Sequence, residues 1–164
     1  MAGEGKTSDP ESVSNLPADL QLEYYWREGT VPPPYHYEYR VRVDASGNGE
    51  VLFHPDYPSE QPPEWREPFA VPPLELERLY RQMVEQEVLG REWAPIPDME
   101  APIGGSLESL EIVENAQRSQ IPAAIVDAPR VKAIYRIIRS LVPETTWKSL
   151  MDQREAYIRE QLGE

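Results

Sequence analysis

The feature that most constrains this chain is a run of strict two-residue alternation that follows a proline triplet. Between residues 35 and 43, aromatic and β-branched side chains alternate with ionisable ones. The apolar set is Tyr35, Tyr37, Tyr39, Val41 and Val43, and the ionisable set is His36, Glu38, Arg40 and Arg42. A period of two matches the side-chain repeat of a strand and does not fit an amphipathic helix. The run therefore predicts a half-buried strand whose five apolar residues, Tyr35 included, face the core.

Two shorter segments extend this strand into a meander. Residues 20–27 alternate in the same way, and residues 50–54 resume the apolar face with Val51 and Phe53 after a glycine-containing turn at 44–49. If Val43 pairs with Val51, then His54 lies opposite Arg40. His36 then lies on the same polar face, about 13 Å from His54. Two ligands of one zinc ion cannot span that distance, so both histidines are predicted to be surface residues.

The middle of the chain reads as a proline-dense connection followed by a helix. Residues 55–73 contain too many prolines to pair inside a sheet. Pro72 or Pro73 suits the first turn of a helix, and Gly90 suits its end. Apolar residues at helical spacing lie between them at Leu76, Leu79, Tyr80 and Met83.

The last third of the chain predicts further strands and then helices. Residues 107–125 fit either a second hairpin or a short helix, and a hairpin is favoured because the segment starts after two glycines and contains Ile121-Pro122. Pro129 and Pro143 each open a segment with apolar residues at helical spacing. These signals predict an α+β fold. It has an antiparallel sheet of about five strands, a three-stranded meander plus a second hairpin, with about three helices packed on one face. We expect one domain over residues 19–164, after a disordered acidic tail over residues 1–18.

Charge and cysteine content narrow the functional classes. The chain has no cysteine, which excludes disulfides, thiolate nucleophiles and cysteine-bound zinc. Its net charge of −13 argues against binding nucleic acid or an anionic membrane surface, and favours a basic protein partner. We find no apolar run long enough to span a membrane and no secretory signal, so a cytoplasmic location is expected.

The proline triplet itself resembles a docking peptide. Residues 32–35, PPPY, match the P-P-x-Y pattern that binds aromatic-lined grooves in an extended conformation. Because Tyr35 is assigned to the core, docking it elsewhere would unbury a ring, and we expect the prolines to serve as the lead-in to a strand.

Aromatic residues in the proline-rich connections give the remaining candidate sites. Tyr57, Trp65 and Trp93 lie outside any periodic segment, so they form either a lid over the sheet or anchors for a partner. With His36 and Arg40 on the polar strand face, these are the candidate partner-binding residues. No nucleophile, metal-ligand or cofactor motif accompanies them, and we predict no catalytic residue, metal or cofactor. Three hypotheses remain: a non-catalytic interaction or regulatory module, a small-ligand binder or enzyme with a pocket between sheet and loops, and a self-associating structural subunit.

Overall fold

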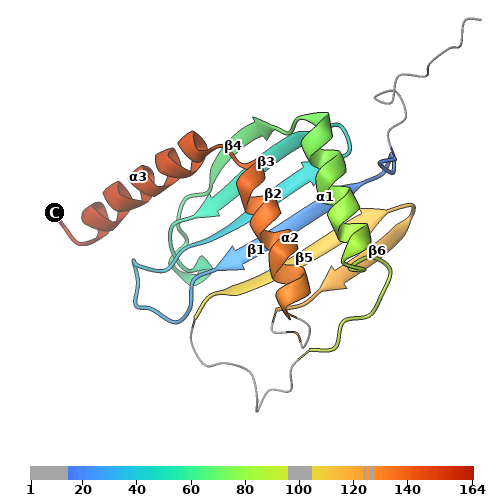
Figure 1. Ribbon diagram of the computed structural model, residues 1–164. Helices are drawn as coiled ribbons and strands as arrows, with labels where there is room; N and C mark the ends of the chain where they lie inside the picture. The colour runs from blue at the N-terminus through green and yellow to red at the C-terminus, as the bar shows by residue number, and fades with distance from the viewer. Residues whose placement is uncertain (1–14, 96–104, 124, 126–127) are drawn as a thin grey trace, which may run out of the picture.

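The computed structural model describes residues 15–95, 105–123, 125 and 128–164, and its described part is built on one six-stranded sheet. All neighbouring strands are antiparallel, in the order β4-β3-β2-β1-β5-β6 (Figure 1). The strands are β1 (Gln21–Arg27), β2 (Glu38–Asp44), β3 (Asn48–His54), β4 (Trp65–Ala70), β5 (Leu107–Glu114) and β6 (Gln117–Ile121). The first strand in the chain therefore lies in the middle of the sheet.

Three helices of the described residues have a proline in or next to their first turn, as the sequence predicts, and pack on one face of this sheet. They are α1 (Pro73–Glu85), α2 (Ala128–Leu141) and α3 (Glu144–Gln161), and a short 3₁₀ turn, η2 (Pro58–Glu60), precedes β4. Helices α1 and α2 cross the sheet side by side, and α3 leads away from the end of α2 (Figure 1). Proline suits these positions because a first-turn residue has no intrahelical use for its N–H group.

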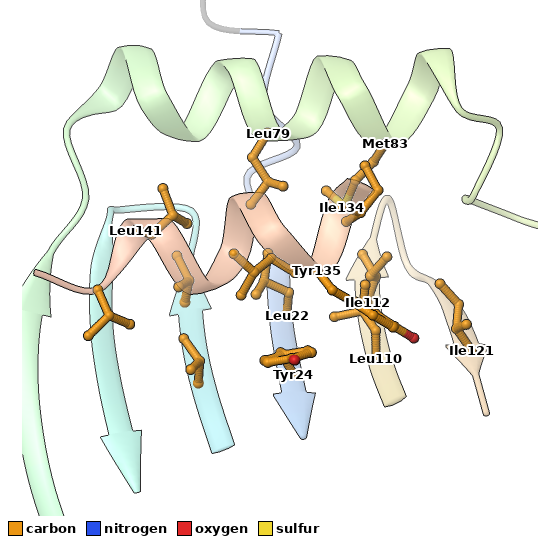
Figure 2. Close-up of a cluster of buried hydrophobic side chains, with 14 of the residues drawn as sticks. Leu22, Tyr24, Leu79, Met83, Leu110, Ile112, Ile121, Ile134, Tyr135 and Leu141 are labelled. Carbon is orange, nitrogen blue, oxygen red and sulfur yellow. The ribbon is translucent and has the colours of Figure 1, made fainter. Parts of the chain in front are cut away.

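The core lies between the sheet and the two crossing helices. Leu79 and Met83 point from α1 toward α2 and the sheet, Ile134 of α2 lies beside Met83, and Tyr135 of α2 points toward the strands (Figure 2). They meet the alternate apolar residues of the strands, which include Leu22, Tyr24, Leu110, Ile112 and Ile121. All of these side chains are buried, so the apolar space between sheet and helices is filled.

A row of stacked aromatic rings extends the core toward α3. Trp26, Tyr39, Phe53 and Trp65 are cross-strand neighbours on β1, β2, β3 and β4. The Tyr39 and Trp65 rings lie 6.3 and 5.7 Å from the Phe53 ring, both nearly parallel to it. Helix α3 covers the row, with Trp147 edge-on to Tyr39 and Tyr157 edge-on to Trp65.

The predicted α+β class, the N-terminal meander, the second hairpin and the three helices are confirmed. The sheet has six strands where about five were expected, because part of the proline-dense connection forms β4. Pro68 lies within β4 and is tolerated there because β4 is the last strand at its edge of the sheet. Trp65 accordingly belongs to a strand and not to a loop.

The predicted pairing of β2 with β3 is wrong by two residues. Val41, not Val43, lies opposite Val51, so His54 faces Glu38 and Arg40 faces Leu52. The turn explains the difference, because the Asp44 carboxylate accepts the N–H groups of both Ser46 and Asn48. Those two hydrogen bonds close the turn immediately after Asp44 and start β3 at Asn48.

Tyr35 and His36 exchange the environments predicted for them. Tyr35 is 43% exposed and His36 only 2% exposed. The reason is local: the Tyr35 N–H group donates to the Pro32 carbonyl at 3.0 Å, which makes a turn of residues 32–35, and β2 begins only at Glu38. The two-residue alternation therefore applies from Tyr37 onward. The PPPY segment is turned rather than extended, so it does not have the conformation that a P-P-x-Y ligand needs.

The start of the chain is tied to the distant β5–β6 turn through Asp19. Its two carboxylate oxygens accept the N–H groups of Asn115 and Ala116, each at 2.7 Å. The hydrogen bonds from Ala116 and then Asn115 hold the pKa of Asp19 below its ordinary value. Residues 1–14, which hold most of the predicted tail, lie outside the described residues, whereas Leu16 packs against the core.

We expect Asp19→Ala to loosen the β5–β6 turn specifically. Both residues at the turn have positive φ, at 50° and 61°, an arrangement that few side chains favour without added support. Hydrogen exchange should show faster exchange of the Asn115 and Ala116 amides, with Asp152→Asn on exposed α3 as a control that leaves them unchanged. The wild-type protection should be present above the ordinary pKa of an aspartate and be lost as pH falls through the lowered value. Equal exchange in wild type and D19A would contradict this role.

Candidate functional site

The helices leave one face of the sheet uncovered in the part of the chain that the structure describes (Figure 1). We call it the open face. Its side chains come from the alternate positions of the strands that do not enter the core. One cross-strand row runs Arg66, Leu52, Arg40, Tyr25 and Ser109, and the next runs Glu50, Arg42, Glu23 and Glu111. Antiparallel sheets often have one face covered and the other exposed to solvent. In this sheet the exposed face carries many charged side chains.

Arginines and glutamates of the open face are paired with each other. Glu23 accepts hydrogen bonds from Arg40 and Arg42, each at 2.8 Å. Glu111 pairs with Arg118 at 2.7 Å, and Arg66 pairs with Glu64 at 2.7 Å. Leu52 is only 3% exposed although it points to this side, as expected when arginine stems flank an apolar residue. The face is therefore nearly neutral on a chain of net charge −13.

A hollow of about 650 Å³ lies where this face meets the segment that follows α1. Tyr25, Arg40 and Ser109 line it from the strands, and Arg91 and Trp93 line it from the connecting segment. Its volume falls in the range of about 300–1,000 Å³ that is usual for ligand sites. Sequence-distant residues thus meet in one depression on the open face.

Two arginine–aromatic pairs shape this hollow. The Arg40 guanidinium lies 4.4 Å from the centre of the Tyr25 ring, and the Arg91 guanidinium lies 4.4 Å from the centre of the Trp93 ring. Such pairs hold an arginine in place by attraction between the cation and the π face of the ring. Arginine, tyrosine and tryptophan are the residue types that dominate binding energy at protein interfaces.

A second hollow, of about 480 Å³, lies beside the first. Both are lined by Glu23, Glu111 and Arg118, so the two hollows are direct neighbours. Glu23 and Glu111 lie directly opposite each other on β1 and β5, a placement of like charges that is unfavourable by itself. Their arginine partners on either side offset that repulsion.

A buried polar cluster lies at the edge of the open face, around His36. Its Nε2 atom is 2.8 Å from Oε2 of Glu38, and the Tyr25 hydroxyl donates to the other Glu38 oxygen at 3.0 Å. Tyr57 stacks on the imidazole with ring centres 3.7 Å apart. Burial and then the Glu38 charge raise the pKa of Tyr25 to about 12, so its hydroxyl stays protonated as the donor at neutral pH. This cluster is connected through Tyr25 to the larger hollow.

The structure distributes the five predicted site residues over three places. Arg40 and Trp93 meet in the hollow of the open face, His36 and Tyr57 stack on each other, and Trp65 ends the aromatic row under α3. Trp93 is 8% exposed and packs against the core, as a lid residue does.

Tyr25, Glu38 and Arg91 also belong to the site, and they were not predicted from the sequence. Tyr25 carried a usable signal, since it is an aromatic residue at a polar position of its strand. Glu38 and Arg91 carried none, because their roles depend on residues that are distant in the sequence.

The described residues contain no group of three or more His, Asp or Glu side chains placed to hold a metal ion. None of their helices combines the length and apolar character needed to cross a bilayer.

No protein-family model matches the chain, and no curated protein matches it significantly.

Proposed function

We propose that this protein is a non-catalytic interaction module that binds a basic partner protein on its open face. The observation that carries the proposal is the hollow in which Tyr25, Trp93, Arg40 and Arg91 gather from distant segments. Tyr25, Arg40 and Arg91 are of the residue types that dominate interface energies. Strands hold the first two, and a cation–π contact with the buried Trp93 ring holds Arg91 in place.

The size of the open face suits a protein partner. Six strands spaced about 4.8 Å apart, each of about seven residues, give a footprint of roughly 600–700 Å². A standard interface buries about 800 Å² on each partner. The two neighbouring hollows lie on this face, so a partner can fill them with protruding side chains.

The charge of this chain favours a basic protein, and not a nucleic acid, as the partner. The excess negative charge of the chain attracts a basic molecule at long range and speeds its approach. The arginines of the open face are engaged by glutamates, so they do not form the free basic stripe that a phosphate backbone needs. At short range, a partner is selected when its own charges are complementary to the alternating arginines and glutamates of the open face.

The proposal is tested by photo-crosslinking in the native cell. A benzophenone side chain placed at Ser109, inside the hollow, should give one discrete adduct with a basic protein, and the same group at exposed Arg78 on α1 should not. Arg40→Gln should reduce the Ser109 adduct at least about fivefold, because a hot-spot side chain contributes more than about 1 kcal/mol. Arg78→Gln changes the net charge equally and should leave the adduct intact. When the crosslinking is repeated in a lysate of that cell, the adduct should also weaken as salt is raised.

Three outcomes would overturn the proposal. They are the absence of a discrete adduct from Ser109, an adduct that is insensitive to R40Q, and an adduct between two copies of this chain. The last outcome would assign the open face to self-association, which sedimentation at several concentrations would confirm independently.

A further inference from the structure

Glu38 is a buried residue whose two carboxylate oxygens each have their own hydrogen-bond partner. It is the first residue of β2 and is 7% exposed. Its Oε1 atom accepts the Tyr25 hydroxyl at 3.0 Å, and its Oε2 atom lies 2.8 Å from Nε2 of His36. Leaving a buried charged group without its partners is costly, so the carboxylate is confined to this orientation.

His36 fixes one oxygen of this carboxylate because its imidazole is itself buried and stacked. The residue is 2% exposed, and the Tyr57 ring lies on the imidazole with ring centres 3.7 Å apart and an interplanar angle of 9°. The Tyr57 hydroxyl accepts the Val31 N–H group at 3.2 Å, which ties the stacked pair to the loop before β2. Close packing of this kind leaves a side chain little room to move. His36 and Tyr57 therefore form a rigid support for Glu38.

Tyr25 links this support to the hollow of the open face. Its hydroxyl is anchored on Glu38, and the guanidinium of Arg40, its cross-strand neighbour, lies 4.4 Å from the centre of its ring. Arg40 also donates to Glu23 at 2.8 Å, so a ring face and a carboxylate together hold its guanidinium. A partly buried tyrosine can adopt other rotamers unless its polar end is fixed. The orientation of the ring against which Arg40 lies therefore depends on Glu38.

We propose that Glu38 is a positioning residue of the open face: its carboxylate orients Tyr25 and thereby holds Arg40 in the geometry that the partner binds. This inference rests on the proposed function, because it concerns how the binding residues of the hollow are held. Glu38 does not line the hollow, so it acts through Tyr25 and not by touching the partner. A side chain that is already held in its bound conformation does not have to be ordered when the partner binds, which favours binding.

The effect of Glu38 on Arg40 is measured first without a partner, by NMR of the arginine side chains. The ring current of Tyr25 shifts the Nε–H signal of Arg40, which is assigned by its absence in Arg40→Gln. In Glu38→Gln, which removes the charge and keeps the size of the side chain, this signal should move toward the position of an exposed arginine. Tyr25→Phe keeps the ring and removes its hydroxyl, and should move the signal in the same direction. Glu155→Gln, on an exposed position of α3, should leave the signal unchanged. An Arg40 signal that stays in place in both E38Q and Y25F overturns the proposal.

The second measurement uses the photo-crosslink from Ser109. E38Q should reduce the adduct roughly three- to tenfold, the effect of losing one pre-ordered side chain, and E155Q should leave it intact. In the R40Q background, E38Q should cause little further loss, because its effect passes through Arg40. A general loss of stability would instead reduce the adduct by the same factor in both backgrounds.

Two crosslinking results would overturn the proposal. They are an adduct that E38Q leaves intact, and equal reductions by E38Q with and without R40Q. Absence of any adduct from the wild type would overturn the proposed function instead, and the Arg40 signal would still decide whether Glu38 positions Arg40.

Discussion

Phe53→Ala is expected to lower the free energy of unfolding by about 3–5 kcal/mol, as usual when a large buried ring is truncated to alanine. Phe53 is fully buried and stacks on Tyr37, Tyr39 and Trp65. Removing its ring leaves a cavity in the middle of the aromatic row. It also removes favourable ring–ring contacts from three neighbours at once.

Chemical denaturation of F53A checks this value, and Tyr35→Ala is the matched control. Tyr35 is also an aromatic residue, but it is 43% exposed, and the hydrogen bonds of its backbone survive the change. Its truncation should change stability by less than about 0.5 kcal/mol, as at most surface positions. Similar losses for the two variants would mean that Tyr35 belongs to the core.

Raising the pH through the range of tyrosine ionisation is expected to destabilise the fold steeply. Burial raises the pKa of Tyr39 from 10.0 to about 12. The folded state therefore holds this proton more tightly than the unfolded state. The resulting stabilisation is fully present below pH 10 and is lost as pH rises through about 12. A difference of two pKa units corresponds to about 2–3 kcal/mol. Burial likewise raises the pKa values of Tyr24 and Tyr135, so their contributions have the same sign.

Urea denaturation of the wild type at pH 9 and pH 12 measures the total loss. Tyr39→Phe removes one of the ionisations and keeps the ring, so the variant should lose less stability over the same interval. The difference between the two losses is the contribution of the Tyr39 ionisation together with its effect on the pKa of Tyr24. If the free energy of unfolding had the same pH dependence in the wild type and Y39F, the predicted contribution of Tyr39 would be contradicted.

Local periodicity was enough to predict most elements of this fold. Alternation located β1, β2 and β3, and prolines followed by apolar residues at helical spacing located all three helices. The register of strand pairing was harder to predict, because the β2–β3 register depends on how the Asp44 side chain closes one turn. Strand β4 was missed because Pro68 interrupts its short alternation and the preceding connection is rich in proline; a proline is tolerated in this strand because it lies at the sheet edge.

The candidate site was less predictable than the fold, because the residues that form it are far apart in the sequence. Arg40 and Trp93 were both chosen from the sequence, but nothing local indicates that they line the same hollow. His36 was assigned to the surface by extending the alternation through a segment that forms a turn. Its true partners, Glu38 and Tyr57, are brought to it by that turn and by the start of β2.

Because β1 lies inside the sheet, its two edges become paired at different times during synthesis of the chain. Strands β2, β3 and β4 follow β1 directly in the chain, so one edge of β1 can pair with β2 early in synthesis. Its other edge pairs with β5, which is synthesised much later. The hydrogen bond between Asp19 and Asn115 spans 96 residues of chain. At roughly 5–20 residues per second, the ribosome needs some seconds to deliver the second neighbour. During that interval the middle strand of the finished protein is an edge strand, open to pairing with another nascent chain.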